Sequence, residues 1–397
     1  MLNPEARPWN WRLVASLKCN LNIPLTLQPD AQFGCPIPID DTVELRPVRW
    51  SPWTHLPLCV NATADPAAKY CVFTNSRHGV GGISLITTPQ VAADSVGILN
   101  EPVLSNVRLT NNTENDSSDV PYEMIDMPGK GKGIVAKRRI SKHETFMVDY
   151  ASMLVDVNFP FLVKREHGYP LLHSAADQLS DPQRVYALGK SDALARDVIE
   201  NVLRTNAFQS NFASVPHIVL YPLVSRINHA CRPNAFQRFV PRSLAATVAA
   251  ARTIEPGEEI TISYIGGGKT FVDRQAGLKR WGFKCSCDLC SAPGNEVSAS
   301  DTRRLKIQSN HEKVVKAYEN RDAATAVKLT HDILDLMREE DLFLLYAEQY
   351  ENLARIYWAS GNRENAQKYA KMSMAELEKL GFTESESEQL QLILEES

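Results

Sequence analysis

The amino-acid sequence predicts an α+β protein in which a β-rich domain is followed by a helical one. Three observations support this fold class. Strand-like segments occur at 122–127, 145–150 and 259–264, and the last alternates apolar with polar residues as a half-buried strand does. The intervening segment 181–203 has the apolar spacing of helices, which indicates a helical insertion. Beyond Ser300 the pattern is almost wholly helical.

The first part of the chain, residues 1–115, contains no catalytic motif, and its role cannot be read from the sequence. Segments 69–74 and 82–88 have the composition of strands, and the polar stretch 111–119 is typical of a linker. A glycine-rich turn at 129–133 then lies between two predicted strands, the second covering residues 134–137. The β-rich domain is therefore expected to begin after the linker.

Two helices are predicted in the insertion. Asp181-Pro182 begins the first, because proline is favoured at early helix positions. Ser191 is placed to cap the second, whose apolar residues share one face: Leu194, Val198, Ile199, Val202 and Leu203. In the C-terminal part, residues 350–370 resemble a tetratricopeptide helical hairpin with its turn at Gly361. We expect a short helical array there.

Composition limits the class of protein. A length of 397 residues suggests two or three domains, and 44% hydrophobic with 23% charged residues is typical of a globular chain. No apolar run approaches the roughly 18 residues that a membrane span needs. The net charge of −4 argues against a general nucleic-acid binder. We therefore expect no membrane and no direct nucleic-acid partner. We also expect a monomer.

The eight cysteines form two groups with different spacing. The widely separated group is expected to consist of buried thiols in a cytoplasmic or nuclear protein, since no signal core is seen near the N-terminus. Disulfides in a secreted protein are the alternative, and possible glycosylation sites at Asn61, Asn111 and Asn115 agree with it weakly. That group comprises Cys19, Cys35, Cys59 and Cys71. The second group contains a Cys-x-Cys-x-x-Cys cluster, a spacing that favours metal binding.

Four segments carry the candidate chemistry: Gly-Lys-Gly-Lys-Gly-Ile-Val-Ala at 129–136, Arg-Ile-Asn-His-Ala-Cys-Arg-Pro-Asn-Ala at 226–235, Gly-Glu-Glu-Ile-Thr-Ile-Ser-Tyr at 257–264, and Trp-Gly-Phe-Lys-Cys-Ser-Cys-Asp-Leu-Cys at 281–290. Read together, they resemble the SET-domain family of lysine methyltransferases over residues 121–290. The resemblance is strongest to the subgroup with a split SET domain and C-terminal helical repeats. It implies that the second and third segments lie next to each other.

The resemblance implies a binding site for S-adenosylmethionine. Glycines allow a close approach of the backbone, and exposed amides in such a turn can hold a carboxylate. The Asn228 side chain can accept a hydrogen bond from the cofactor's amino group while it donates elsewhere. Asn206 either contacts the cofactor or caps the preceding helix, and both interpretations stay open. The implied cofactor residues are Gly131, Lys132, Gly133, Asn206, Asn228, His229 and Phe283.

Tyr264 is the implied catalytic residue, because the family's closing strand ends in a tyrosine beside the reaction centre. Methyl transfer needs a neutral amine aligned with the methyl carbon, so the enzyme mainly positions the nucleophile and excludes water. A phenol can do this by hydrogen bonding to the lysine nitrogen. A desolvating channel beside a positive sulfonium would favour the deprotonated lysine. His229 is not expected to act as an acid or base.

The fourth segment resembles the family's post-SET zinc segment. Cys231 lies inside the Asn-His motif and completes the set of thiolates with Cys285, Cys287 and Cys290. Four thiolates fill a tetrahedral shell, so this Zn²⁺ is expected to be structural.

The resemblance also divides the chain. It implies a SET domain at 116–266 with the helical insertion at about 155–208, a post-SET zinc segment at 267–297, and a TPR-like helical domain at 298–397. The insertion between Tyr150 and Phe208 does not contain the Cys/His-rich MYND finger of that subgroup, so the resemblance does not imply the partner recognition that this finger provides. From Asp301 onward the chain has 13 Lys and Arg against 19 Asp and Glu, a balance that either attracts a basic partner or, as we prefer, belongs to a solvated helical surface. Concave helical arrays commonly bind peptides, so this array would help to select substrates.

We therefore expect methylation of a lysine in a protein or peptide substrate, histone or non-histone. A catalytically inactive SET scaffold that acts as an interaction module is the main alternative. Methylation of a small molecule or of a group other than lysine is a third. The presence of Asn228, Tyr264 and the four cysteines counts against the scaffold.

Overall fold

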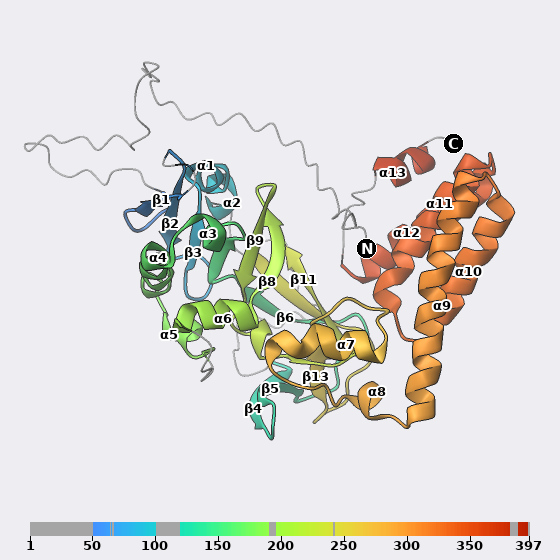
Figure 1. Cartoon of the computed structure of the whole chain (residues 1–397), viewed down its shortest axis with the longest axis horizontal. Coiled ribbons are helices and arrows are strands. Elements are labelled where there is room, and N and C mark those ends of the chain that lie inside the picture. The colour runs from blue at the N-terminus through green and yellow to red at the C-terminus, as the bar shows by residue number, and fades with distance from the viewer. Residues whose placement is uncertain are drawn as a thin grey trace, which may run out of the picture.

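The computed structural model describes residues 51–381 and 388–395, apart from 64, 66, 101–119, 190–195 and 241–242. The predicted linker, the proposed cap at Ser191 and the first fifty residues lie outside the described part. Figure 1 shows the β-rich part, with its short helices, beside a group of long C-terminal helices. The α+β fold class predicted from the sequence is confirmed.

The largest sheet has six strands in the order β1-β2-β3-β7-β9-β8. β3 and β7 pair in parallel, and the other neighbours are antiparallel. The region 1–115 thus supplies three strands of a sheet that continues into the β-rich domain. The strands are β1 (Leu58–Asn61), β2 (Lys69–Asn75), β3 (Ile83–Thr87), β7 (Met153–Asp156), β8 (Phe208–Phe212) and β9 (Val215–Leu220).

Two smaller sheets surround the candidate motifs. One has the order β10-β13-β5-β4, with β4 (Tyr122–Met127), β5 (Gly131–Ala136), β10 (Asn228–His229) and β13 (Glu259–Ile262). The other has the order β11-β12-β6, with β6 (Thr145–Tyr150), β11 (Ala235–Val240) and β12 (Ala245–Ala250). β10 pairs in parallel with β13, Asn228 opposite Thr261, so the second and third motif segments are neighbours as predicted. Buried residues from all three sheets form one core.

Short helices cover the largest sheet and follow the third motif. They are α1 (Pro89–Asp94), α2 (Val96–Asn100), α3 (Phe159–Leu162), α4 (Arg165–Asp177), α5 (Gln183–Tyr186), α6 (Val198–Asn206), α7 (Phe271–Leu278) and α8 (Asp288–Ser291). α6 begins at Val198, because the Asp197 carboxylate caps it by accepting hydrogen bonds from the backbone amides of Ile199 and Glu200. Its buried residues pack with those of α4 against β2 and β7.

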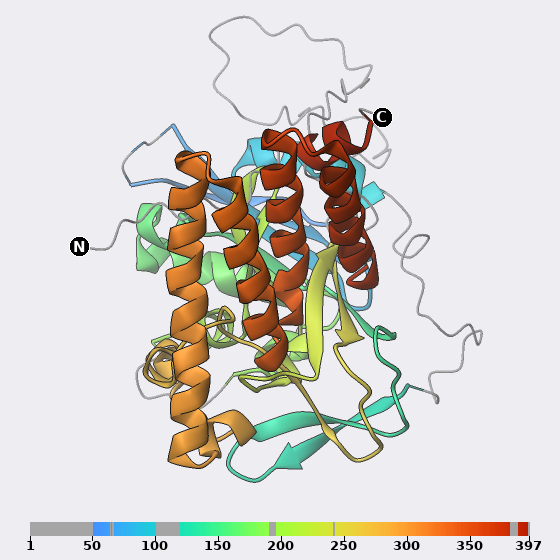
Figure 2. The same cartoon turned by 90° about the vertical axis from the view of Figure 1, so that its right-hand side faces the viewer.

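The C-terminal helices run up and down side by side (Figures 1 and 2). They are α9 (Gly294–Glu319), α10 (Ala323–Glu339), α11 (Tyr346–Ala359), α12 (Arg363–Lys379) and α13 (Glu388–Glu395). Three 3₁₀ turns complete the elements, at Val224–Arg226, Lys279–Trp281 and Phe343–Leu345. The predicted turn at Gly361 joins α11 to α12 with a φ of +79°, a conformation that favours glycine. The Tyr357 and Tyr369 rings stack across this hairpin, with centroids 5.5 Å apart.

The expectation of free thiols is wrong for one pair in the widely spaced group. Cys59 and Cys71 lie opposite each other on β1 and β2, with Cα atoms 4.0 Å apart, and form a disulfide. Antiparallel pairing places them within bonding reach. Cys19 and Cys35 lie outside the described residues. Within the described part, no helix combines the length and the apolar character that crossing a membrane requires.

Candidate active site and metal centre

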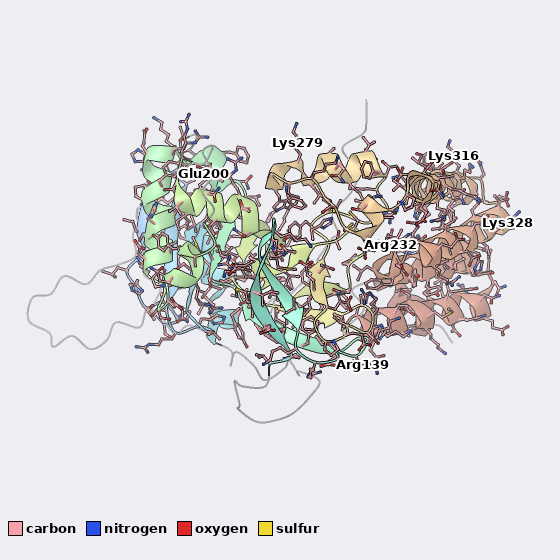
Figure 3. All side chains as sticks on the ribbon, turned by 90° about the horizontal axis from the view of Figure 1, so that it is seen from below. Arg139, Glu200, Arg232, Lys279, Lys316 and Lys328 are labelled. Carbon is pink, nitrogen blue, oxygen red and sulfur yellow. A yellow bond between two sulfur atoms is a disulfide. The ribbon has the colours of Figure 1, made fainter. Side chains whose placement is uncertain are left out.

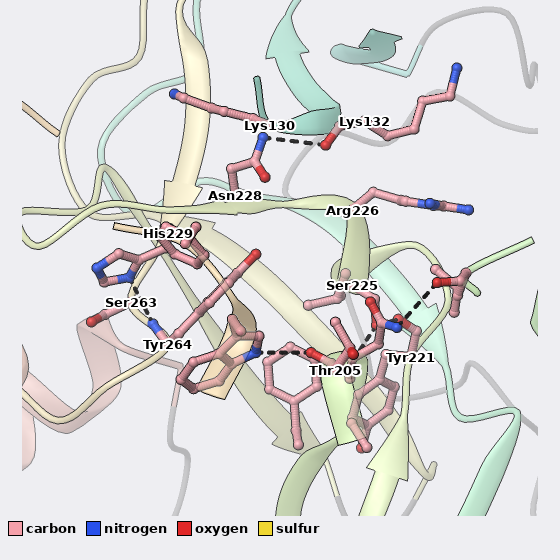
Figure 4. A pocket seen from close by; sticks show the side chains of 18 of the residues that line it. Lys130, Lys132, Thr205, Tyr221, Ser225, Arg226, Asn228, His229, Ser263 and Tyr264 are labelled. Atoms are coloured by element: carbon pink, nitrogen blue, oxygen red, sulfur yellow. Dashed lines mark hydrogen bonds between the residues drawn. The ribbon is translucent and has the colours of Figure 1, made fainter. Parts of the chain in front are cut away.

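A cavity of about 1040 Å³ brings together residues that are far apart in the sequence. Its walls come from the β4–β5 turn, the end of α6, β10, the end of β13 and the segment before the clustered cysteines. Figure 4 shows Asn228, His229 and Tyr264 side by side, with Lys130 and Lys132 across from Asn228. All the predicted cofactor residues except Gly133 line this cavity, and so does Tyr264.

The glycine-rich turn forms a close wall beside Asn228. Gly131 has a φ of +76°, which favours glycine, and the strand β5 begins at this residue rather than at Ile134. Gly133 is buried, and a Cβ atom there would lie 2.2 Å from Met127 Sδ and 2.8 Å from Asn228 Nδ2. Glycine at position 133 is therefore what allows the Asn228 amide to reach the turn.

We expect Gly133→Ala to lower the free energy of unfolding by about 1–3 kcal/mol, the usual range for an overpacked core site. Met127 can rotate away in part, but the displaced Asn228 amide should also weaken cofactor binding. Chemical denaturation and calorimetric titration measure the two effects. Gly97→Ala is the control, because nothing lies within 4 Å of its Cβ and it sits in helix α2. Equal stability of the two variants would contradict the prediction.

The Asn228 amide has a fixed orientation. Its Nδ2 donates to Glu259 Oε1 at 3.0 Å and to the Lys132 carbonyl at 3.3 Å. Glu259 Oε2 in turn lies 2.6 Å from Lys130 Nζ. Among the described residues Oδ1 of Asn228 has no hydrogen-bond partner, so this oxygen is available to accept from a ligand. Sequence reasoning did not single out Glu259, although its segment was recognised.

His229 connects the candidate catalytic residue to the cysteines. Its Nδ1 accepts from the Tyr264 backbone amide at 3.0 Å, so the proton of the neutral ring is on Nε2, 3.3 Å from Cys231 Sγ. Burial lowers the pKa of His229 to about 4. A neutral, buried ring of this kind holds the chain in place, which agrees with the expectation that His229 is not an acid or base.

Tyr264 is held from three sides. Its hydroxyl donates to the Ile227 carbonyl at 2.7 Å, and its ring lies 5.2 Å from that of Trp281 and 5.3 Å from that of His229. Burial, with a smaller contribution from Glu259, raises its pKa to about 12, so the phenol is protonated at neutral pH. Its position and protonation state are therefore both fixed.

Trp281 closes one side of the cavity, a role that the sequence did not indicate. Its Nε1 donates to the Thr205 carbonyl at 2.9 Å, which links the segment before the cysteines to the end of α6. Phe283 is 39% exposed, with its ring 6.5 Å from that of Tyr264 and nearly perpendicular to it. Asn206 Nδ2 donates to the Val202 carbonyl at 2.9 Å while the residue lines the cavity, so the two interpretations of Asn206 are compatible.

Asp149 is a further residue that sequence reasoning missed. It is 2% exposed, and its Oδ2 accepts from the backbone amides of Leu223 and Val224. Its Oδ1 lies 3.2 Å from Arg184 of α5. The carboxylate thereby orders the turn that leads into Asn228. In the sequence, a single aspartate in a strand carries no signal that distinguishes it from a surface residue.

The pH dependence of stability should reveal this buried carboxyl. Burial raises the pKa of Asp149 from 3.8 to about 6, although the hydrogen bonds it accepts oppose the shift. Between these values the folded state binds more protons than the unfolded chain, so the contribution of Asp149 to the free energy of unfolding falls as the pH rises. Urea denaturation measures the free energy of unfolding of the wild type and of Asp149→Asn at each pH. The wild-type value minus the variant value should fall by about 1 kcal/mol from pH 5 to pH 7. A constant difference would contradict the shift.

The four predicted cysteines converge at the edge of the cavity. All four Sγ atoms lie within 4.8 Å of one another, with Cys231 Sγ 3.9 Å from Cys285 Sγ and 3.6 Å from Cys290 Sγ. A tetrahedral zinc site with metal–sulfur distances near 2.3 Å has sulfur–sulfur edges of roughly 3.8 Å. The donor set and its spacing therefore fit Zn²⁺.

Comparisons with known proteins give a family match that spans Asn228, His229 and Tyr264. The SET domain family model matches residues 131–265. Histone-lysine N-methyltransferase set5 of Schizosaccharomyces pombe is 29% identical over 195 residues, which is 47% of this chain and 56% of that protein. A SET and MYND domain-containing protein of Dictyostelium discoideum is 45% identical over 85 residues, 21% of this chain and 24% of that protein.

Histone-lysine N-methyltransferase ATXR2 of Arabidopsis thaliana is 44% identical over 79 residues, 19% of this chain and 17% of that protein. The chain thus spans 56%, 24% and 17% of the lengths of these three curated relatives. Two of these three relatives are named histone-lysine N-methyltransferases. The resemblance to the SET-domain family is confirmed, and the chain contains a SET domain at residues 131–265.

Proposed function

We propose that this chain transfers a methyl group from S-adenosylmethionine to a lysine side chain of a protein. The observation that carries the proposal is the convergence of the glycine turn, Asn228 and Tyr264 on one cavity. These residues come from three separate parts of the sequence, so chance proximity is a poor explanation. The names of two relatives, histone-lysine methyltransferases, support a protein substrate.

The cofactor would lie against the glycine turn and Asn228. When bound, S-adenosylmethionine supplies a methyl group activated on a sulfonium sulfur. The free Oδ1 of Asn228 can accept a hydrogen bond from an ammonium group, while Glu259 and Lys132 hold the amide in that orientation. Gly131 and Lys132 present backbone at the cavity wall, and Phe283 adds an apolar surface.

Tyr264 would orient the lysine nitrogen. Because its hydroxyl donates to the Ile227 carbonyl, its remaining lone pairs can accept a hydrogen bond from the amine. The aromatic rings of Trp281 and Phe283 exclude water on one side, which favours a neutral amine beside a positive charge. The protein's contribution is then mainly alignment of the nucleophile.

Zinc would fix the part of the cavity wall that contains Trp281 and Phe283. The thiolates of Cys231, Cys285, Cys287 and Cys290 would hold the metal. Because four thiolates would leave no position for water, the role of the metal would be structural. Trp281 and Phe283 come just before Cys285 in the sequence, so the metal would fix both rings at the cavity. The C-terminal helices, which we propose to be a TPR-like domain at 298–397, would contact the protein that carries the lysine.

Cofactor binding is the direct test. In calorimetric titration of the zinc-loaded protein, Asn228→Ala should weaken S-adenosylmethionine binding by about 10–100-fold, because a hydrogen bond to a charged group contributes about 1.5–3 kcal/mol. Asn211→Ala is the matched control, since Asn211 is exposed and does not line the cavity. Folded wild-type protein that does not bind the cofactor would favour the inactive interaction scaffold instead.

A further inference from the structure

A buried carboxylate links the C-terminal helices to the β-rich part. Glu340, at the end of α10, has no exposed surface. Its Oε1 accepts from Arg303 at 2.6 Å, and its Oε2 accepts from Ser300 at 2.6 Å and from Arg304 at 2.8 Å. Oε2 also lies 3.4 Å from Arg232 Nη2. Figure 3 shows Arg232 next to the C-terminal helices.

The surrounding arginines depend on this carboxylate. Arg304 and Arg274 are each 1% exposed, and both donate to the Lys269 carbonyl, so their guanidinium groups lie close together. Asp301 lies 3.5 Å from Arg274 and is itself partly exposed. Several guanidinium nitrogens of Arg274 and Arg304 have no partner in the described part of the chain. The buried arginines therefore carry more positive charge than the nearby carboxylates balance. Among the described residues Glu340 is their one fully buried counter-ion, so removing its charge would leave these arginines poorly compensated.

The same carboxylate connects the two halves of the cysteine cluster. Arg232 directly follows Cys231, whereas Arg303 and Arg304 lie on α9, which begins four residues after Cys290. Glu340 contacts all three arginines. We infer that Glu340 is a positioning residue that holds Cys231 and the three clustered cysteines in register, and through them the cavity wall that carries Trp281. This inference rests on the zinc site within the proposed function.

The test uses the zinc-loaded full chain and the rate at which a chelator removes the metal. Glu340→Gln should speed zinc release by about tenfold, the lower end of what outer-shell partners of metal ligands contribute. Glu339→Gln is the matched control, because Glu339 has the same charge, is 60% exposed and lies 3.5 Å from Arg303. The control should stay within about twofold of wild type.

A double variant separates positioning from general loosening. Arg232→Gln should also speed zinc release. In the double variant with Glu340→Gln, the increase in rate should be smaller than the product of the two single increases, because both substitutions break the same contact between Glu340 and Arg232. The inference would be overturned if Glu340→Gln released zinc at the wild-type rate. It would also be overturned if the two single effects on the zinc-release rate simply multiplied in the double variant. If Glu340→Gln does not fold, Glu340→Asp replaces it, with the same expected direction.

The outcomes also distinguish this inference from the metal site itself. Wild-type protein that binds no zinc would refute the metal centre. The positioning role is then decided by the alkylation rate of Cys231, which is only 8% exposed. Faster alkylation in Glu340→Gln but not in Glu339→Gln would support it, and equal rates in all variants would overturn it.

Discussion

Replacing Tyr264 with Phe is expected to lower the rate of methyl transfer by about 100-fold or more, while cofactor affinity stays within about twofold. The variant keeps the ring that packs between Trp281 and His229, so the cavity wall remains. It loses the hydroxyl that donates to the Ile227 carbonyl and would accept from the amine. The lysine nitrogen would then reach the reaction centre without a fixed direction.

The measurement is single-turnover transfer of a labelled methyl group to a protein substrate, alongside calorimetric titration of the cofactor. Tyr221→Phe is the matched control. Tyr221 lines the same cavity, and its buried hydroxyl has no partner among the described residues, so removing that hydroxyl should change little. Undiminished transfer by Tyr264→Phe would show that the phenol does not orient the nucleophile.

Patterns within a few contiguous residues were sufficient to predict individual turns and strands. The turn at Gly361 and the start of the alternating strand at Glu259 depend on neighbouring residues and lie where predicted, although β13 ends at Ile262. The glycine turn is shorter than predicted, because β5 begins at Gly131. The α+β class and the SET domain are confirmed for the same reason, because the motifs that indicate them are short and contiguous.

Pairings between distant segments could not be derived in this way. The parallel pairing of β3 with β7 joins residues about seventy positions apart, and no periodicity in either strand specifies its partner. The disulfide between Cys59 and Cys71 follows from the register of β1 and β2, which spacing alone does not reveal. The sequence of region 1–115 therefore did not indicate that its strands belong to the same sheet as strands of the β-rich domain.

The complete or partial burial of certain acidic residues was the other feature hidden from sequence reasoning. Asp149, Glu259 and Glu340 are ordinary acidic residues in the sequence, and acidic residues are mostly exposed. In the structure each accepts hydrogen bonds that position another segment: the turn before Asn228, the Asn228 amide, and the arginines near the cysteine cluster. The residues proposed to touch ligands were recognisable by type and spacing, whereas the residues that position them were not.

Replacing Cys285 with Ser is expected to remove zinc from the protein and to weaken S-adenosylmethionine binding by about tenfold or more. The Cys285 backbone is held independently of its sulfur, because its amide and carbonyl bond to the Gln275 side chain at 3.0 Å. The substitution therefore tests the metal itself. Loss of one of four thiolates should exceed the 10–100-fold cost in zinc affinity that is usual for an outer-shell partner.

The weaker cofactor binding would follow from the freed wall of the cavity. Without metal, the segment that carries Trp281 and Phe283 keeps only its protein contacts, such as the bond from Trp281 to the Thr205 carbonyl. Elemental analysis and calorimetric titration measure both effects, with Cys59→Ser as the control that removes a sulfur outside the cluster. A Cys285→Ser protein that retains one zinc ion and normal cofactor affinity would show that Cys285 is not a ligand, and the fourth position would have to come from another residue.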